Sequence, residues 1–117
     1  MNSPDDWQFG DTSAIPWQVM ETGQKIKLIA ALGGTGFILT EVPAGFVGPV
    51  HHHDGLEYLY VLEGSVVSNG VRVEAGGGYI AAAGTEHDEF RSETGARFLV
   101  VFTFPPDQNA NALRAEG

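Results

Sequence analysis

Short runs of β-branched and aromatic residues, separated by glycine and proline, follow one another along most of the chain. Apolar and polar positions alternate within several runs, and a helical period of 3.6 residues is almost absent before the last ten residues. This pattern predicts eight strands, and eight short strands in about 80 residues fit a β-sandwich or a small barrel. The predicted strands span residues 26–32, 37–42, 50–53, 57–62, 65–68, 71–74, 78–82 and 97–104.

Two glycine-containing sequences mark turns between these strands. Asn69 and Gly70 lie between the runs VVS and VRV, and an Asn-Gly pair tolerates the positive φ angles of a type I′ turn, so residues 65–74 are predicted to form a hairpin. The sequence GGTG at residues 33–36 lacks the lysine and helix that follow in a phosphate-binding loop. It is therefore predicted to be a turn between strands.

The length and composition fit one globular domain. The chain has 117 residues, of which 43% are apolar and 18% charged, and no apolar stretch is long enough to span a membrane. The acidic N-terminal sequence differs from the basic start of a secretory signal, so a cytoplasmic protein is expected. We expect an N-terminal arm at residues 1–25 that packs across the body, a β-barrel domain at 26–104 and a C-terminal tail at 105–117.

Charge and cysteine content exclude several kinds of site. Six basic and fifteen acidic residues give a net charge of -9, which argues against binding to nucleic acid or to an anionic membrane. The chain has no cysteine, so disulfides and thiolate metal sites are excluded. Any metal ion must be held by histidine and carboxylate side chains.

Histidine and glutamate side chains at suitable spacing form a candidate metal site. In a strand His51 and His53 point to the same side while His52 points to the other, and the turn that follows brings Glu57 beside them. His87, in a later loop, offers a third imidazole. Surface histidines or a purification tag are simpler explanations, but a tag would lie at a terminus. Three histidines and one carboxylate suit one Fe(II), Mn(II), Ni(II), Cu(II) or Zn(II) ion per chain.

These residues fall into a spacing that resembles the first motif of the cupin superfamily. That motif runs glycine, five residues, His-x-His, three or four residues, glutamate, six residues, glycine. Gly45, His51, His53, Glu57 and Gly64 match each fixed position. The resemblance implies an all-β double-stranded β-helix, a jelly-roll barrel with a metal ion inside.

The second cupin motif is matched in part. Gly76, Gly84 and His87 stand at its glycine and histidine positions, whereas Ala82 replaces its proline and Arg91 replaces its asparagine. Both departures affect the stiffness of the loop more than metal ligation. The likeness extends over roughly residues 37–104.

The resemblance implies two classes of function. The chain resembles small non-haem iron dioxygenases that cleave carbon–carbon bonds of diketones or hydroxyacetophenones, which favours an Fe(II) enzyme acting on a small keto or diketo compound. An isomerase or cyclase that uses the metal only as a Lewis acid is a variant of this hypothesis. It also resembles the zinc-binding cupin domain of some anti-sigma factors, which favours a non-catalytic sensor or ligand-binding module. The sequence assigns no catalytic residue beyond the metal ligands.

Two further sets of side chains bear on assembly and on the pocket. Tyr58 and Tyr60 alternate with Glu57, so both are predicted to face outward, and exposed aromatic residues of this kind favour a homodimer. Phe98, Val100, Phe102 and Phe104 share one face of the last strand. They are predicted to form core, with the alternative that one or two of them line an apolar pocket near the metal.

Overall fold

Antiparallel strands form the regular structure of the computed structural model, which describes residues 6–103. Eleven strands in this range pair into a nine-stranded and a two-stranded sheet, so the predicted all-β class is confirmed. No helix in residues 6–103 has the length and apolar character needed to cross a membrane. The strands are β1 (Gln18–Val19), β2 (Lys25–Leu32), β3 (Thr35–Val42), β4 (Phe46–Val47), β5 (His51–His52), β6 (Glu57–Ser68), β7 (Val71–Glu74), β8 (Gly78–Ala81), β9 (Glu86–His87), β10 (Phe90–Ser92) and β11 (Ala96–Thr103).

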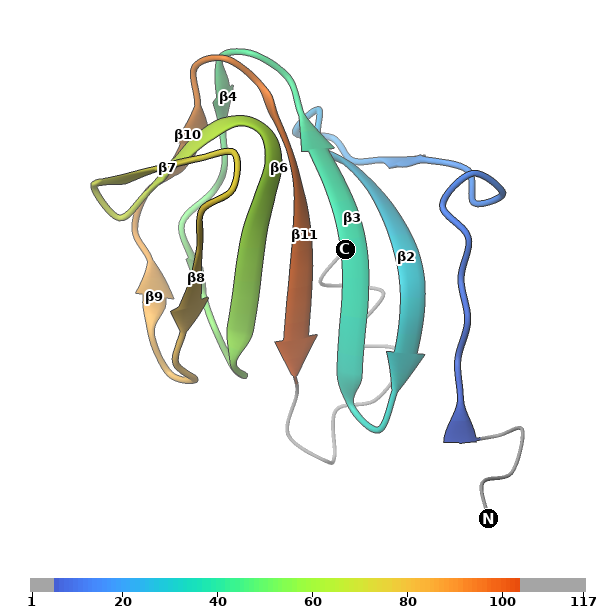
Figure 1. The fold of residues 1–117 in the computed structure, drawn as a ribbon. Helices are drawn as coiled ribbons and strands as arrows, with labels where there is room; N and C mark the ends of the chain where they lie inside the picture. The colour runs from blue at the N-terminus through green and yellow to red at the C-terminus, as the bar shows by residue number, and fades with distance from the viewer. Residues whose placement is uncertain (1–5, 104–117) are drawn as a thin grey trace.

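The large sheet is curved, as Figure 1 shows for β2, β3, β11 and β6. Its strand order is β1-β2-β3-β11-β6-β10-β4, and β7 and β8 also pair with β6. The first half of β6 pairs with β11 and β8, and its second half pairs with β10 and β7. The chain thus adopts the predicted jelly roll, in which β6 is shared by both parts of the curled sheet.

The interruption predicted between residues 62 and 65 does not occur, because residues 57–62 and 65–68 belong to the single strand β6. Gly64 joins the two halves with a φ of 75°, a conformation that favours glycine. A Cβ atom at Gly64 would lie 2.0 Å from the carbonyl oxygen of Gly95. The register between β6 and β11 shifts between Arg97 and Phe98. This irregularity bends β6 without ending it.

Both predicted turns are confirmed. Asn69 and Gly70 have φ angles of 46° and 83°, and Ser68 pairs with Val71 across the turn, as in a type I′ hairpin. Gly33 has a φ of 61° and Gly34 a φ of 80°, and together they connect β2 to β3. The GGTG sequence is a tight turn.

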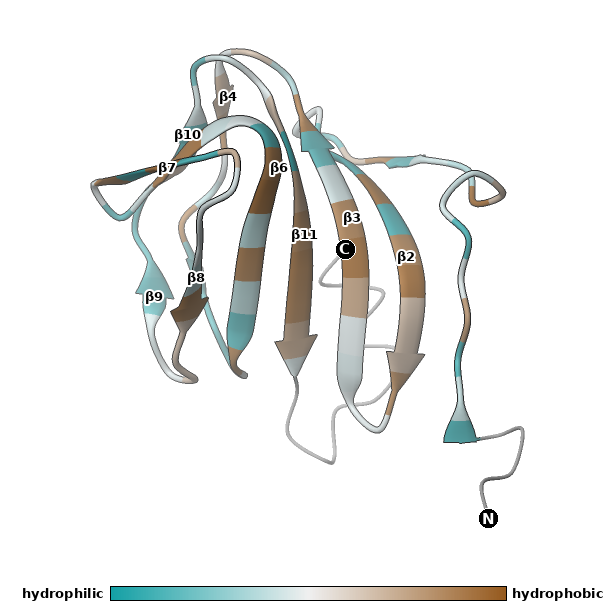
Figure 2. Cartoon of the chain, viewed as in Figure 1, coloured by the Kyte–Doolittle hydropathy of each residue, from teal (hydrophilic) through white to brown (hydrophobic). Residues whose placement is uncertain are grey.

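Alternate side chains of the long strands point into the curl of the sheet and form the core. On β11, Phe98, Val100 and Phe102 are at most 7% exposed, and Figure 2 shows apolar residues along β11 and in bands along β6. Tyr58 and Tyr60 are 46% and 48% exposed, so they face outward as predicted. The homodimer inferred from these tyrosines stays a prediction.

The structure corrects the strand predictions mainly at short elements. Strands β1, β4, β9 and β10 are two or three residues long and were not predicted, and the strand expected at 50–53 is reduced to β5. Runs this short contain too few positions to show alternation. Their pairing is set by contacts with distant parts of the chain.

The segment before β2 lies against that strand. β1 pairs with β2 at Gln18 and Ile26. The Lys27 ammonium donates a hydrogen bond of 2.6 Å to the carbonyl oxygen of Thr12 and lies 4.6 Å from the ring centre of Trp17. These contacts fit an arm that packs on the body, while the domain boundaries after residues 25 and 104 stay predictions. The tail predicted at 105–117 lies outside the described residues.

Candidate metal centre

Backbone pairing between β5 and β9 brings the two histidine-bearing segments together. His51 lies directly opposite His87, and His52 lies opposite Glu86. Beyond this pair, the amide of His53 donates to the carbonyl oxygen of Thr85 at 2.8 Å. Directly opposed residues in an antiparallel pair have neighbouring side chains. The small β5–β9 sheet therefore sets His51, His53 and His87 beside one another.

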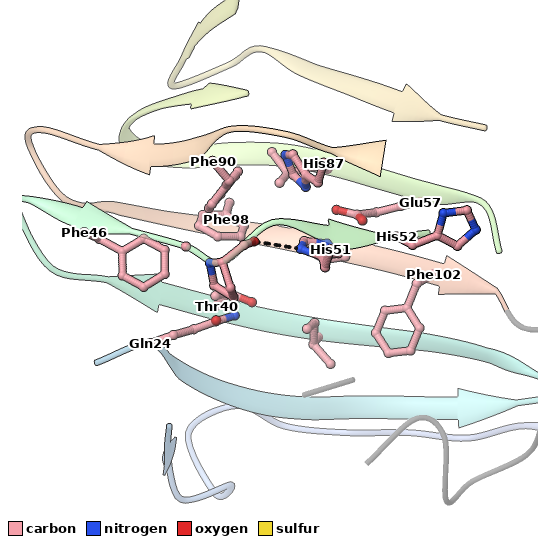
Figure 3. A pocket seen from close by; sticks show the side chains of 15 residues that line it. Gln24, Thr40, Phe46, His51, His52, Glu57, His87, Phe90, Phe98 and Phe102 are labelled. Atoms are coloured by element: carbon pink, nitrogen blue, oxygen red, sulfur yellow. Dashed lines mark hydrogen bonds between the residues drawn. The ribbon is translucent and has the colours of Figure 1, made fainter. Parts of the chain in front are cut away.

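The four residues predicted as metal ligands converge on one point, and Figure 3 shows three of them, His51, Glu57 and His87. The imidazole centres are 5.0 Å apart for His51 and His53, 5.0 Å for His51 and His87, and 5.2 Å for His53 and His87. One potential ligand atom from each histidine and from Glu57 lies within 4.8 Å of the others. His53, Glu57 and His87 are buried, and His51 is partly exposed. This His/Glu cluster could bind a metal ion.

Hydrogen bonds on the outer side of the cluster fix the protonation of two imidazoles. Nδ1 of His51 lies 3.3 Å from the carbonyl oxygen of Pro49, which can only accept, so Nδ1 carries the proton. The Thr85 hydroxyl donates to the carbonyl oxygen of Ala82 at 2.6 Å and can therefore accept from Nδ1 of His53 at 3.4 Å. The neutral tautomer of each ring then has its lone pair on Nε2.

The third imidazole is held through a chain of two hydroxyl groups. Ser68 Oγ donates to the Tyr79 hydroxyl at 3.1 Å and lies 2.5 Å from Nε2 of His87, from which it accepts. This arrangement leaves the lone pair of His87 on Nδ1. Burial raises the pKa of Tyr79 above its ordinary value, so its phenol stays protonated at neutral pH.

Two of the nitrogens turned toward the cluster are buried and without a hydrogen-bond partner among the described residues. These atoms are Nε2 of His53 and Nδ1 of His87. Nε2 of His53 is 2.7 Å from Oε2 of Glu57, but the alignment does not make a hydrogen bond. Two electron-rich atoms at this separation are stabilised by a cation that both can bind. The donor set therefore fits a divalent metal ion.

Burial keeps these imidazoles neutral, which is the form that binds metal ions. Burial lowers the pKa of His87 to about 4, with a smaller effect from His51 and His53 nearby. Burial likewise lowers the pKa of His53, with further contributions from His51 and His52. At neutral pH both rings offer a lone pair without first releasing a proton.

An apolar cavity of about 320 Å³ adjoins the cluster. His51, Glu57 and His87 line one part of it (Figure 3). Phe98, Val100 and Phe102 are buried in the core, as predicted, and all three also line this cavity, where the alternative expected one or two. Phe104 lies outside the described residues. Sequence reasoning missed most of the other lining residues, because they come from separate elements. The apolar members are Ile38, Phe46, Gly48, Pro49, Leu59, Phe90, Phe98, Val100 and Phe102, and the polar members beyond the cluster are Gln24, Thr40 and His52.

His52 differs from its two neighbours, as the alternation predicted. Its side chain is 52% exposed, and its Nε2 lies 3.9 Å from Oδ1 of Asp54. It lines the cavity but does not belong to the cluster of converging ligand atoms.

The loop that carries His87 is held by the tip of the β6–β7 hairpin. The amide side chain of Asn69 donates to the carbonyl oxygen of Glu86 at 3.0 Å and accepts from the amide of Glu89 at 3.1 Å. The carboxylate of Glu89 in turn accepts from the amide of Gly70 at 2.8 Å. The sequence marked Asn69 as a turn residue, but nothing in its local pattern indicated contacts on both sides of His87.

Comparison with known proteins places the chain among cupins. Residues 6–105 match the profile of the family described as ChrR cupin-like domain. No curated protein sequence is significantly similar to the chain.

Solved structures share the fold at low sequence identity. A provisionally assigned acetylacetone dioxygenase from Methylibium petroleiphilum has a TM-score of 0.81 and 16% identity, over 99% of this chain and 97% of that one. An acetylacetone dioxygenase from Acinetobacter johnsonii has a TM-score of 0.65 and 15% identity, over 88% and 72%. A chain in the complex of Rhodobacter sphaeroides SigE with the anti-sigma ChrR has a TM-score of 0.70 and 26% identity, over 79% of this chain and 50% of that one.

Proposed function

We propose that the chain, which belongs to the ChrR cupin-like domain family, is a mononuclear metal enzyme, an Fe(II) dioxygenase acting on a small keto or diketo compound. The ligands in this proposal are His51, His53, Glu57 and His87. Three neutral nitrogens and one carboxylate make a set that suits Fe(II), and also Mn(II), Ni(II), Cu(II) or Zn(II). The resemblance of the sequence to non-haem iron dioxygenases favours Fe(II), and solved structures that share the fold include acetylacetone dioxygenases.

The single observation that carries the proposal is the cavity beside the cluster. A structural zinc site is closed, whereas a catalytic site keeps open positions next to space for a substrate. His51, Glu57 and His87 line a cavity of about 320 Å³ whose other walls are largely apolar. This volume lies in the range of small-molecule sites.

Different side chains would contribute to different parts of the reaction. When bound, the metal would supply Lewis acidity that stabilises a diketone as its enolate and polarises its carbonyl group. Phe98, Val100 and Phe102 would hold the carbon skeleton and exclude water from it. The carboxylate of Glu57 would temper the charge of the centre. In the overall reaction O2 is the oxidant, one carbon–carbon bond breaks, and both oxygen atoms enter the two products.

Oxygen uptake after anaerobic reconstitution with Fe(II) tests this proposal. A panel of 1,3-diketones and hydroxyaryl ketones should include at least one compound that is cleaved with consumption of one O2 per molecule. The same protein loaded with Zn(II) is the matched control and should consume none. Absence of uptake with every compound, together with tightly bound zinc in the protein as purified, contradicts the dioxygenase. Anaerobic conversion of a compound without uptake indicates the isomerase or cyclase variant instead.

A zinc-binding sensor or ligand-binding module is the second candidate. It is supported by the family's description and by the likeness to a chain of the SigE–ChrR complex. Four protein ligands can also complete a tetrahedral zinc site. X-ray absorption on the zinc-loaded protein separates the candidates, because four protein ligands without water favour the module and exchangeable water positions favour the enzyme.

A further inference from the structure

Thr40 is a polar residue in a largely apolar wall of the cavity. It lies on β3 with the inward-facing Ile38 and Val42, and its side chain is 0% exposed. Its hydroxyl oxygen has no hydrogen-bond partner among the described residues. A buried hydroxyl without a partner destabilises a protein, and valine would fill the same space without that penalty. The hydroxyl therefore lacks a role in holding the fold.

Strand register separates Thr40 from the metal cluster along the cavity. On β11, Phe98 lies opposite Thr40, while Phe102 lies opposite Glu57. Four residues of a strand span roughly 13 Å. Thr40 and Glu57 are therefore well separated along the direction of β11. Figure 3 shows Thr40 on a different wall from Glu57.

A second polar side chain lies in the same part of the cavity. Gln24 lines the cavity and precedes by two residues Ile26, which pairs with Thr40 across β2 and β3. Figure 3 labels both residues on the β2–β3 side of the cavity. The row between Thr40 and Glu57 is apolar, because Val100 on β11 lies opposite Ile38 on β3 and Leu59 on β6, and all three line the cavity.

We propose that Thr40, with Gln24 on the same side of the cavity, is the second anchor of the substrate and binds an oxygen atom distant from the metal-chelating group. This inference rests on the proposed function, in which the metal ion is the first anchor of the substrate. The substrate is then a keto or diketo compound with an apolar middle and a second oxygen at its far end, rather than a simple alkyl diketone. One good hydrogen bond to this oxygen raises affinity about tenfold.

Binding of matched diketones to the metal-loaded protein tests the second anchor. The probes are 1-phenylbutane-1,3-dione and its 3- and 4-hydroxyphenyl derivatives, titrated anaerobically into wild type, Thr40→Val and Thr40→Ser. Wild type and Thr40→Ser should bind one hydroxyphenyl derivative about tenfold more tightly than the parent compound. Thr40→Val should bind the parent as well as wild type does and lose the tenfold preference. Equal affinity of wild type for all three compounds overturns the proposal.

Thermal unfolding of the metal-free proteins gives a second readout. If the Thr40 hydroxyl has no structural partner, Thr40→Val should raise the melting temperature relative to wild type. A lower melting temperature in Thr40→Val, with wild-type stability in Thr40→Ser, shows that the hydroxyl is bonded within the fold and overturns the assignment. Failure of the metal-loaded wild type to bind any of the diketones contradicts the proposed function itself. In that case the melting temperatures still test whether the Thr40 hydroxyl has a partner within the fold.

Discussion

Each imidazole of the cluster has one nitrogen engaged by an oxygen outside it and the other directed inward. The outer partners are the carbonyl oxygen of Pro49 and the hydroxyls of Ser68 and Thr85. Such outer hydrogen bonds orient metal-binding histidines and set their tautomer. The spacing of the histidines in the sequence predicted that they would bind a metal ion, but it did not predict these partners. A serine on β6 and a proline before β5 have no feature in the local sequence that indicates such a hydrogen bond.

Ser68→Ala tests the outer bond to His87. The variant removes the oxygen 2.5 Å from Nε2 of His87, so the ring loses its fixed orientation and the metal affinity should fall 10- to 100-fold. Competition with a chelator measures this affinity. Ser65→Ala is the matched control, since Ser65 Oγ contacts the Thr94 hydroxyl at 3.2 Å and no histidine. Equal affinity of Ser68→Ala and wild type contradicts the assignment.

The low pKa of His87 predicts how the stability of the metal-free protein depends on pH. The ordinary value is 6.5 and the folded value about 4, so between these values the unfolded chain binds a proton that the folded chain does not. Stability is complete above about pH 6.5 and falls as the pH drops toward about 4. Near pH 4 the protonation of His87 in the unfolded chain lowers the free energy of unfolding by roughly 3 kcal/mol.

Urea unfolding of the metal-free protein across this pH range measures the effect. His87→Gln is the control, and its free energy of unfolding should depend on pH less steeply than that of wild type between pH 6.5 and 4. Parallel pH profiles for the two proteins show that the pKa of His87 is not lowered in the fold.

At the scale of elements, alternation predicted the long strands because one face of each is buried. β3, β6 and β11 follow this rule, and the prediction erred at Gly64, where a glycine bends a strand that a turn would have ended. Strands β5 and β9 have two residues each, and only their pairing places His51 opposite His87. The sequence thus predicted which residues belong to the cluster, while the ladder that joins them depends on tertiary contacts.

Asn69→Gly tests the hydrogen bonds that join the β6–β7 hairpin to the loop that carries His87. Glycine keeps the φ of 46° accessible but removes the hydrogen bonds to Glu86 and Glu89. The loop loses its support on both sides of His87, so metal affinity should fall about tenfold while the hairpin still forms. Asn69→Asp keeps the acceptor for Glu89 and should show a smaller loss. Unchanged metal affinity in Asn69→Gly would mean that the loop is held by other contacts.

The whole molecule combines a largely buried His/Glu cluster with a cavity that adjoins it. The curled sheet places apolar side chains of β3, β6 and β11 around a space that ends at His51, Glu57 and His87. The sequence predicted the cluster from the spacing of its residues, whereas it left open whether the apolar face of β11 formed core or cavity. That difference depends on how far the sheet curls, which alternation alone does not determine.

The central claim is that His51, His53, Glu57 and His87 hold one metal ion, and metal content per chain tests it most directly. After reconstitution and removal of loose metal, elemental analysis should find one divalent ion per chain in wild type and none in the His51→Ala/His53→Ala double variant. His52→Ala should keep full occupancy, because its exposed side chain lies outside the cluster. Full occupancy in the double variant, or its loss in His52→Ala, would contradict the ligand assignment.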